Sequence, residues 1–277
     1  MADKIPIPRG TVGGFLASLL ALAVVLPASP VEAGERGREL ARKVDQRPDG
    51  EDAAIRSTMV LQSSGAEPRV RKLRTFRLDR GDKEVWSLTR FVEPANIDGT
   101  GLLTRDYAGG ETDQWLFLPA LEKVRRIAGD RKGGRFVGSD LFYEDLRDRE
   151  ASMDRHRLRG TESLDGTTTK VLVSTPVDPG NSTYSKRVRW IHPRTLIDLR
   201  VDFYKKAREE PIKRMRVHRI EKVQGYWTVM DSTTTDLRSG HKTRIRVEEL
   251  RYDQGLPEDL FNRRVLSSPG EADRFQP

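Results

Sequence analysis

The 277-residue sequence contains no cysteine. This absence excludes disulfide bonds, thiolate metal sites and a cysteine nucleophile. A bacterial lipoprotein carries its acyl chains on a cysteine at the cleavage site, so we do not expect this chain to be a lipoprotein itself. A domain without disulfides has to be stabilised by its hydrophobic core, which is feasible at this length.

Residues that support catalysis or metal binding are also scarce. The sequence has no Gly-x-Ser-x-Gly elbow, no Gly-x-Gly-x-x-Gly loop and no P-loop. The acids between Asp140 and Asp148 do not form a calcium-binding loop. The histidines lie singly and lack the spacing of metal ligands: His156, His192, His218 and His241. We therefore expect no catalytic residue, no metal site and no cofactor, and the chain is not expected to be an enzyme.

The longest uncharged apolar stretch, from Val12 to Leu26, is too short for a membrane-spanning helix of about 20 residues. Basic residues precede it, and the small-x-small sequence Val31-Glu32-Ala33 follows. This arrangement is typical of a signal peptide that is cleaved after Ala33. The expected organisation is a signal peptide over residues 1–33 and a single domain over 34–277, located in a bacterial periplasm.

The chain has 50 Lys+Arg against 42 Asp+Glu, which gives a formal net charge of +8. An excess of cations can indicate nucleic-acid binding. Here the cations alternate with acids along the predicted strands, and export removes most nucleic acid from reach. We therefore expect no nucleic-acid partner, and instead expect transient contact with an anionic membrane surface or with an acidic partner.

Much of the chain shows the period-two alternation of strands. The clearest example runs from Ile197 to Tyr204, and residues 55–62, 70–78 and 84–92 form three further segments joined by polar or glycine-containing links. A short helix is expected over Arg38–Val44. Because no long helical pattern separates the strands, the sequence predicts a mainly β fold: a large, curved antiparallel sheet forming a barrel or half-barrel.

Residues 99–150 are rich in glycine and contain a basic block, 123–135, followed by an acidic block, 140–154. Adjacent blocks of opposite charge can pair with each other. Two interpretations of Arg125 and Arg126 are therefore open. They could form an ion network with Asp140, Glu144 and Asp145, or they could contact a lipid headgroup or the acids of a partner.

Continuous apolar runs occur at Trp115–Pro119 and Leu141–Tyr143, and the predicted strand 84–92 is apolar on both faces. Apolar residues on both faces of a strand indicate either a covering element or an apolar cavity. If a cavity is present, the apolar side chains that we expect to bind lipid are Met59, Leu61, Phe76, Trp86, Leu88, Phe91, Trp115, Leu118 and Phe142.

Several motifs in a fixed order carry a family resemblance. They are Phe91 with Pro94, Gly99-Thr100, Asp113 to Leu121, Lys123 to Ile127, Phe136, Gly138-Ser139-Asp140, Tyr143 to Leu146, Tyr184 to Arg187, Gly225-Tyr226-Trp227, Thr235 with Gly240 to Thr243, and Gly255-Leu256-Pro257 with Leu260-Phe261. In these residues the sequence resembles the LolA-like outer membrane lipoprotein-sorting protein family of exported bacterial proteins. The motifs extend over nearly the whole predicted domain.

The resemblance implies an unclosed antiparallel β half-barrel whose concave face is covered by helices or a loop, which encloses a hydrophobic cavity. Such a protein would bind the acyl chains of lipids or lipoproteins and shuttle them toward the outer membrane. The resemblance also implies a possible RND/MMPL-type membrane exporter as a partner. We expect the glycine-rich residues 99–138 to supply the lid. The alternative is a non-enzymatic adaptor that binds such an exporter through its sheet edge and basic surface.

Overall fold

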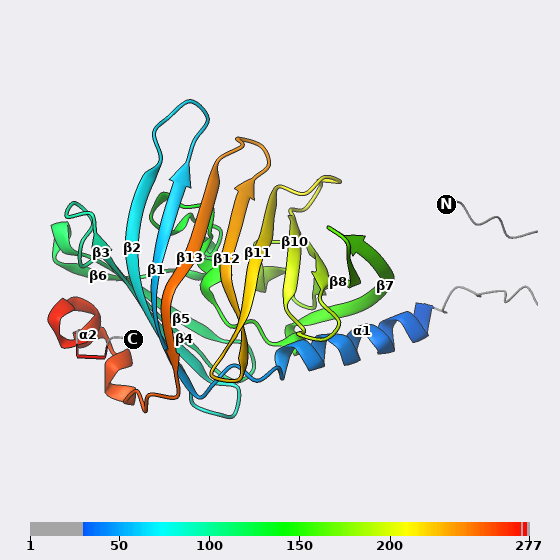
Figure 1. Ribbon diagram of the computed structural model, residues 1–277, viewed down its shortest axis with the longest axis horizontal. Coiled ribbons are helices and arrows are strands. Elements are labelled where there is room, and N and C mark those ends of the chain that lie inside the picture. The colour runs from blue at the N-terminus through cyan, green and yellow to red at the C-terminus, as the bar shows by residue number, and fades with distance from the viewer. Residues whose placement is uncertain (1–29, 273, 276–277) are drawn as a thin grey trace, which may run out of the picture.

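The computed structural model describes residues 30–272, 274 and 275. In this part of the chain, thirteen antiparallel strands form one sheet whose two ends do not pair with each other (Figure 1). The strands are β1 (Asp52–Gln62), β2 (Arg69–Asp79), β3 (Val85–Glu93), β4 (Gly101–Asp106), β5 (Thr112–Leu118), β6 (Lys123–Arg126), β7 (Asp154–Leu164), β8 (Thr167–Pro176), β9 (Lys186–Ile191), β10 (Asp198–Tyr204), β11 (Lys213–Val223), β12 (Tyr226–Asp236) and β13 (Lys242–Tyr252).

Two α-helices and eight short 3₁₀ turns complete the described chain. They are α1 (Pro30–Asp45), α2 (Arg263–Ser267), η1 (Pro119–Leu121), η2 (Gly129–Arg131), η3 (Phe136–Gly138), η4 (Tyr143–Leu146), η5 (Ala151–Met153), η6 (Pro179–Asn181), η7 (Glu258–Phe261) and η8 (Pro269–Ala272). The prediction of a mainly β, unclosed antiparallel sheet is confirmed, and the four strands predicted above match β1, β2, β3 and β10. The predicted helix lies inside α1, which starts earlier. Of the predicted signal peptide, residues 1–29 lie outside the described residues.

The order of the strands explains how the chain crosses the sheet. β1 pairs with both β2 and β13, so the first and last strands meet in the middle of the sheet. Successive hairpins extend outward from this centre and end at β6 on one side and at β7 on the other. The two edge strands are therefore consecutive in the sequence, and the chain between them has to pass from one edge of the sheet to the other (Figure 1).

One face of the β1–β5 half is covered by the C-terminal segment, residues 256–272. Phe76, Leu88 and Leu103 lie opposite one another on adjacent strands, so they share this face, and the C-terminal segment packs against them. Arg90 donates a hydrogen bond of 2.8 Å to the carbonyl of Val265 at the end of α2. Cationic donors stabilise the free carbonyls at a helix C-terminus, so Arg90 helps to hold the segment on the sheet.

The opposite face of the same strands carries Met59 and Leu61, whose cross-strand partners on β13 are Ile245 and Thr243. Residues 127–146, which we call the covering segment, contact this face of strands in both halves of the sheet. One segment can contact both halves only if the sheet curves around it, so this face is the concave one. Helix α1 covers the β7–β9 end of the concave face, where Leu40 and Ala41 pack against Leu172 and Ile191 (Figure 1).

The predicted lid is therefore placed too early in the sequence. Residues 99–138 were expected to cover the sheet, but most of 101–126 forms β4, β5 and β6. The reason is that both faces of β4 and β5 are packed, one by the C-terminal segment and the other by the covering segment. Their strands are consequently apolar on both faces, and the period-two pattern that identifies a strand is lost.

Leu266 of the C-terminal segment is fully buried against the convex face of the sheet, the face that carries Phe76 and Leu88. Truncating a buried leucine removes apolar contacts and leaves a cavity, so we expect Leu266→Ala to lower the free energy of unfolding by about 2–5 kcal/mol. Urea denaturation measures this value. The matched control is Leu121→Ala, because Leu121 is 48% exposed; its effect should stay below about 0.5 kcal/mol. Equal effects of the two variants would contradict the packing described here.

His156 gives the stability a defined pH dependence. Burial lowers its pKa below the ordinary value of 6.5, although the hydrogen bond to the Ala151 carbonyl acts in the opposite direction. The unfolded chain therefore binds a proton more readily than the folded chain, and stability falls as the pH drops below about 6.5. We expect His156→Gln to reduce the slope of unfolding free energy against pH between about pH 7 and 5. Urea titrations at several pH values test this; an unchanged slope would contradict it.

Candidate functional site

The concave face of strands β1–β5 is mainly apolar. Its buried side chains form one cluster together with two residues of the covering segment: Met59, Leu61, Leu73, Phe91, Leu102, Phe136 and Tyr143. Phe136 packs on Phe91 with ring centroids 5.4 Å apart and meets Tyr143 edge-on at 6.2 Å. The covering segment thus places aromatic rings where another apolar molecule could lie.

Hydrogen bonds from the sheet hold the backbone of the covering segment. Gln114 Nε2 donates to the carbonyl of Tyr143 at 2.9 Å, and Arg71 Nη1 donates to the carbonyl of Val137 at 2.6 Å. Val137 has φ 46° and ψ 41°. This left-handed conformation is strained for a β-branched side chain. The bond from Arg71 therefore helps to hold a backbone position that the sequence alone does not favour.

Asp140 is the most completely buried acid of the covering segment, with no exposed side-chain surface. Its carboxylate accepts hydrogen bonds from Arg135 at 2.8 Å and from Thr243 Oγ1 at 2.8 Å, and it lies 2.6 Å from His241 Nδ1. Thr243 Oγ1 also accepts a bond from the backbone N–H of Asp140 at 2.9 Å. Arg135 in turn pairs with Asp236 of β12. A buried carboxylate needs several such donors, so this network fixes the segment to β12 and β13.

The next two acids pair with cations on the other half of the concave face. Glu144 accepts a hydrogen bond from Arg187 of β9 and another, at 2.6 Å, from the backbone N–H of Thr183. Asp145 accepts hydrogen bonds from Lys213 of β11 and from the hydroxyl of Tyr184, the latter at 2.8 Å. These charge-assisted bonds join the covering segment to the β9–β11 half of the sheet.

Lys213 lies among aromatic rings. Its ammonium group is 4.0 Å from the ring centroid of Phe142, 4.7 Å from that of Phe203 and 4.9 Å from that of Tyr184. Burial lowers the pKa of Lys213, while the nearby carboxylate of Asp145 opposes that change. Burial also raises the pKa of Tyr184 well above its ordinary value, so this hydroxyl stays protonated and donates to Asp145. The concave face therefore has an apolar half and a charged half.

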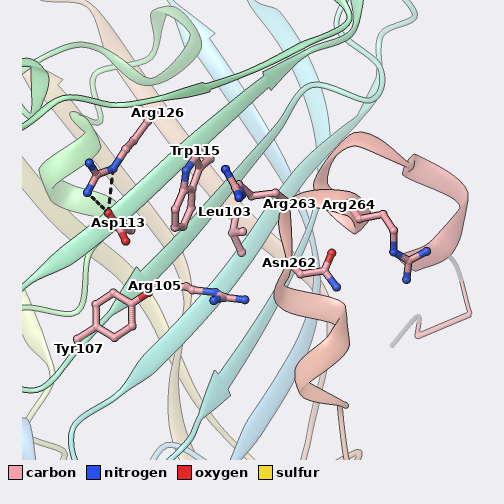
Figure 2. Close-up of a pocket in the computed structure, with 9 residues that line it drawn as sticks. All are labelled: Leu103, Arg105, Tyr107, Asp113, Trp115, Arg126, Asn262, Arg263 and Arg264. Atoms are coloured by element: carbon pink, nitrogen blue, oxygen red, sulfur yellow. Dashed lines mark hydrogen bonds and ion pairs between the residues drawn. The ribbon is translucent and has the colours of Figure 1, made fainter.

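A groove of about 700 Å³ lies on the convex face, between β4–β6 and the start of α2 (Figure 2). Its lining includes four arginines, Arg105, Arg126, Arg263 and Arg264, and a single carboxylate, Asp113. Figure 2 shows Arg126 paired with Asp113 and Arg263 next to Trp115, and the Arg263 guanidinium lies 5.9 Å from the Trp115 ring centroid. The groove is therefore strongly cationic and has an aromatic wall.

The structure distributes the nine predicted lipid-binding residues over several places. Met59, Leu61 and Phe91 lie together in the concave cluster. Phe76, Trp86, Leu88 and Trp115 belong to the convex cluster under the C-terminal segment. Phe142 packs with Tyr184, Ile212 and Phe203. Leu118 is partly exposed and belongs to none of the buried clusters. Alternation along a strand separates its two faces, but it does not tell which face is concave.

The two predicted contact residues, Arg125 and Arg126, are both exposed. Arg126 pairs with Asp113 in the convex groove, and Arg125 has no ion-pair partner among the described residues. The ion network that would join them to Asp140, Glu144 and Asp145 does not form. Those acids pair instead with Arg135, Arg187 and Lys213.

Sequence reasoning missed Arg187 and Lys213 as residues of the site. Arg187 lies within a motif that carries the family resemblance, Tyr184 to Arg187, so a signal for it was present. Lys213 had no such signal, because a single lysine at the start of a strand does not differ from a solvent-exposed lysine. In the described part of the chain no three His, Cys, Asp or Glu side chains are grouped so that they could hold a metal ion. Neither described helix has the length and apolar composition needed to span a bilayer.

Comparison with known proteins gives consistent matches to one group. A family model described as "Uncharacterized protein" matches residues 83–268. A search of curated protein sequences found no match. A crystal structure of an outer membrane lipoprotein-sorting protein domain from Vibrio parahaemolyticus is 31% identical, with a TM-score of 0.80, and the match covers 84% of this chain and 99% of that one.

Two further solved structures agree with this match. A DUF1329 family protein from Desulfovibrio piger is 32% identical, with a TM-score of 0.80 and coverage of 84% of this chain and 99% of that one. A LolA superfamily protein from Nitrosomonas europaea shares the fold at 18% identity, with a TM-score of 0.66 and coverage of 83% and 98%. The chain therefore belongs to the LolA-like family of outer membrane lipoprotein-sorting proteins.

Proposed function

We propose that the protein is a periplasmic carrier that binds the acyl chain of a lipid or lipoprotein on the apolar half of its concave face and shuttles it toward the outer membrane. The observation that carries this proposal is the covering of that face. Met59, Leu61 and Phe91 are buried by short 3₁₀ turns and irregular chain rather than by a further sheet or long helix. A cover of this kind can move without breaking the sheet.

Burial of an acyl chain offsets part of the cost of displacing the covering segment. Each buried CH₂ group contributes about 0.8 kcal/mol, so a chain of ordinary length gains enough to compete with the aromatic rings of Phe136 and Tyr143. The strained backbone of Val137 lowers the cost of releasing the segment. A carrier needs such a balance, because a cavity that bound its cargo too tightly could not release it.

The expected location rests on two independent observations. The first 33 residues have the pattern of a signal peptide, with cleavage after Ala33. The Vibrio parahaemolyticus relative is described as an outer membrane lipoprotein-sorting protein. Both support a protein that works between the two membranes. A non-enzymatic role fits the paired, fold-stabilising contacts that the acids of the covering segment make.

The carrier proposal is tested by binding oleate to detergent-free protein while recording hydrogen exchange. The backbone amide of Ile127 is bonded to Gln114 and that of Phe136 to Leu141. We expect residues 127–146 to lose protection when oleate is bound, and the β11–β12 hairpin to keep it. Binding without this change, or no binding at saturating oleate, would contradict the proposal.

A variant within the apolar half gives a second readout. Leu116 is partly buried on the concave side of β5, next to the cluster. We expect Leu116→Asn to weaken oleate binding about tenfold, because it places an amide on the apolar surface. Leu121→Asn is the matched control, since Leu121 is 48% exposed outside the cluster; it should bind oleate as the wild type does.

The convex groove favours a second candidate function, that of an adaptor for an RND/MMPL-type exporter. Its four arginines face one carboxylate and suit an acidic partner surface. Under this function, charge reversal at Arg126 and Arg263 should abolish binding to the purified periplasmic domains of such an exporter while oleate binding stays unchanged. Lys222→Glu, at an exposed position on β11, is the control. Retained binding by the charge-reversed variant would exclude the adaptor role of this groove.

A further inference from the structure

The charged half of the concave face encloses a pocket of about 290 Å³ beside the apolar half. Five cationic and four carboxylate side chains line it. Two of the carboxylates, Glu144 and Asp145, belong to the covering segment, whereas the cations belong to the strands or to the chain that follows the segment. The charge balance of the pocket therefore depends on whether the covering segment is in place.

Moving the covering segment would leave five cations facing two carboxylates. Arg187 and Lys213 would lose their closest partners, Glu144 and Asp145. Both cations are nearly buried, with 11% and 3% of the side-chain surface exposed. Cations in such a position need replacement anions or water. An anion stabilises them more strongly in a site that excludes water, because the attraction between opposite charges is greater at low dielectric.

Arg187 is incompletely satisfied even when the segment is in place. Its Nη1 is buried and has no hydrogen-bond acceptor among the described residues. Asp154 Oδ2 lies 3.6 Å from this nitrogen, too far for a hydrogen bond. A buried guanidinium with a free donor indicates that this wall can accept a further oxygen.

The pocket adjoins the apolar half at Leu141. Leu141 packs against the concave cluster of Phe91 and Leu102 and also lines the charged pocket. Val201, Phe203 and Met215 add apolar surface to the pocket wall. A molecule with an apolar tail in the first region would therefore place its end group in the second.

We propose that this pocket binds the anionic group of the acyl ligand, and that its carboxylate or phosphate oxygens take the places of Glu144 and Asp145 on Arg187 and Lys213. The inference rests on the proposed carrier function and specifies its ligand as an anionic amphiphile. In the absence of ligand, the two acids of the covering segment occupy the anion site themselves. When the ligand binds, its anionic group replaces the carboxylates of Glu144 and Asp145, and the covering segment is released.

The test compares ligands that share one oleoyl chain and differ only in the end group. Equilibrium dialysis below the critical micelle concentration would measure 1-oleoyl lysophosphatidate against 1-oleoylglycerol, and oleate against oleyl alcohol. We expect the anionic member of at least one pair to bind about tenfold more tightly. Preference in the first pair alone assigns a phosphate headgroup, and preference in both assigns either anion. Equal binding within both pairs overturns the inference but leaves the carrier function standing, whereas no binding of any probe overturns both.

Variants locate the anion site. Arg187→Gln and Lys213→Met should each remove most of the preference for the anionic probe over its neutral partner. Arg125→Gln is the matched control, because Arg125 is exposed and contact with a headgroup is one of the two interpretations that the sequence leaves open for it. Loss of the preference in Arg125→Gln but not in Arg187→Gln overturns the inference.

A variant with an increased preference for the anionic probe controls for misfolding. The double variant Glu144→Gln, Asp145→Asn removes the carboxylates that occupy the anion site and leaves the cations in place. We expect its preference for lysophosphatidate over oleoylglycerol to rise at least about threefold, which an unfolded protein cannot produce. An unchanged or reduced preference in this variant overturns the inference.

Discussion

The passage of residues 127–146 through the concave face is the constraint on which the rest of the structure depends. Because the edge strands β6 and β7 are consecutive in the chain, the link between them has to cross strands of both halves. The polar groups of that link lie inside the curved sheet and need partners there. Asp140 finds them at β13 and its own segment, Glu144 at β9 and Asp145 at β11. Buried charges are costly when unpaired, so these contacts fix the path of the link.

The two halves of the sheet differ in the chemistry of their concave surfaces. Strands β1–β5 are covered on both faces, and their convex side, with Phe76 and Leu88, is held by the C-terminal segment. That packing is separate from the contacts that the covering segment makes on the concave face. In the other half, Arg187 and Lys213 make the concave face charged. A face that is apolar at one end and charged at the other suits a ligand with the same division.

The sequence could predict the strands because their surroundings are simple. The sequence from Ile197 to Tyr204 alternates clearly between apolar and polar residues, so it predicts β10 to within one residue. Trp115 and Phe117, by contrast, pack on the convex side of β5 while Leu116 packs on the concave side. Such a strand has no alternation, so the sequence places residues 101–126 in the predicted lid. The same limitation explains why the predicted lipid-binding residues include members of both faces.

The sequence by itself determined the mainly β architecture, the absence of cysteine chemistry and, through its ordered motifs, the family. These properties depend on residue types and local spacing, which are visible along the chain. Only the tertiary structure decided that Arg187 and Lys213, rather than Arg125, pair with the acids of the covering segment. The partners are 43 and 68 residues apart in the chain. Such pairing depends on how the sheet curves, because the curvature brings the concave surfaces of β9 and β11 to the link between the edge strands.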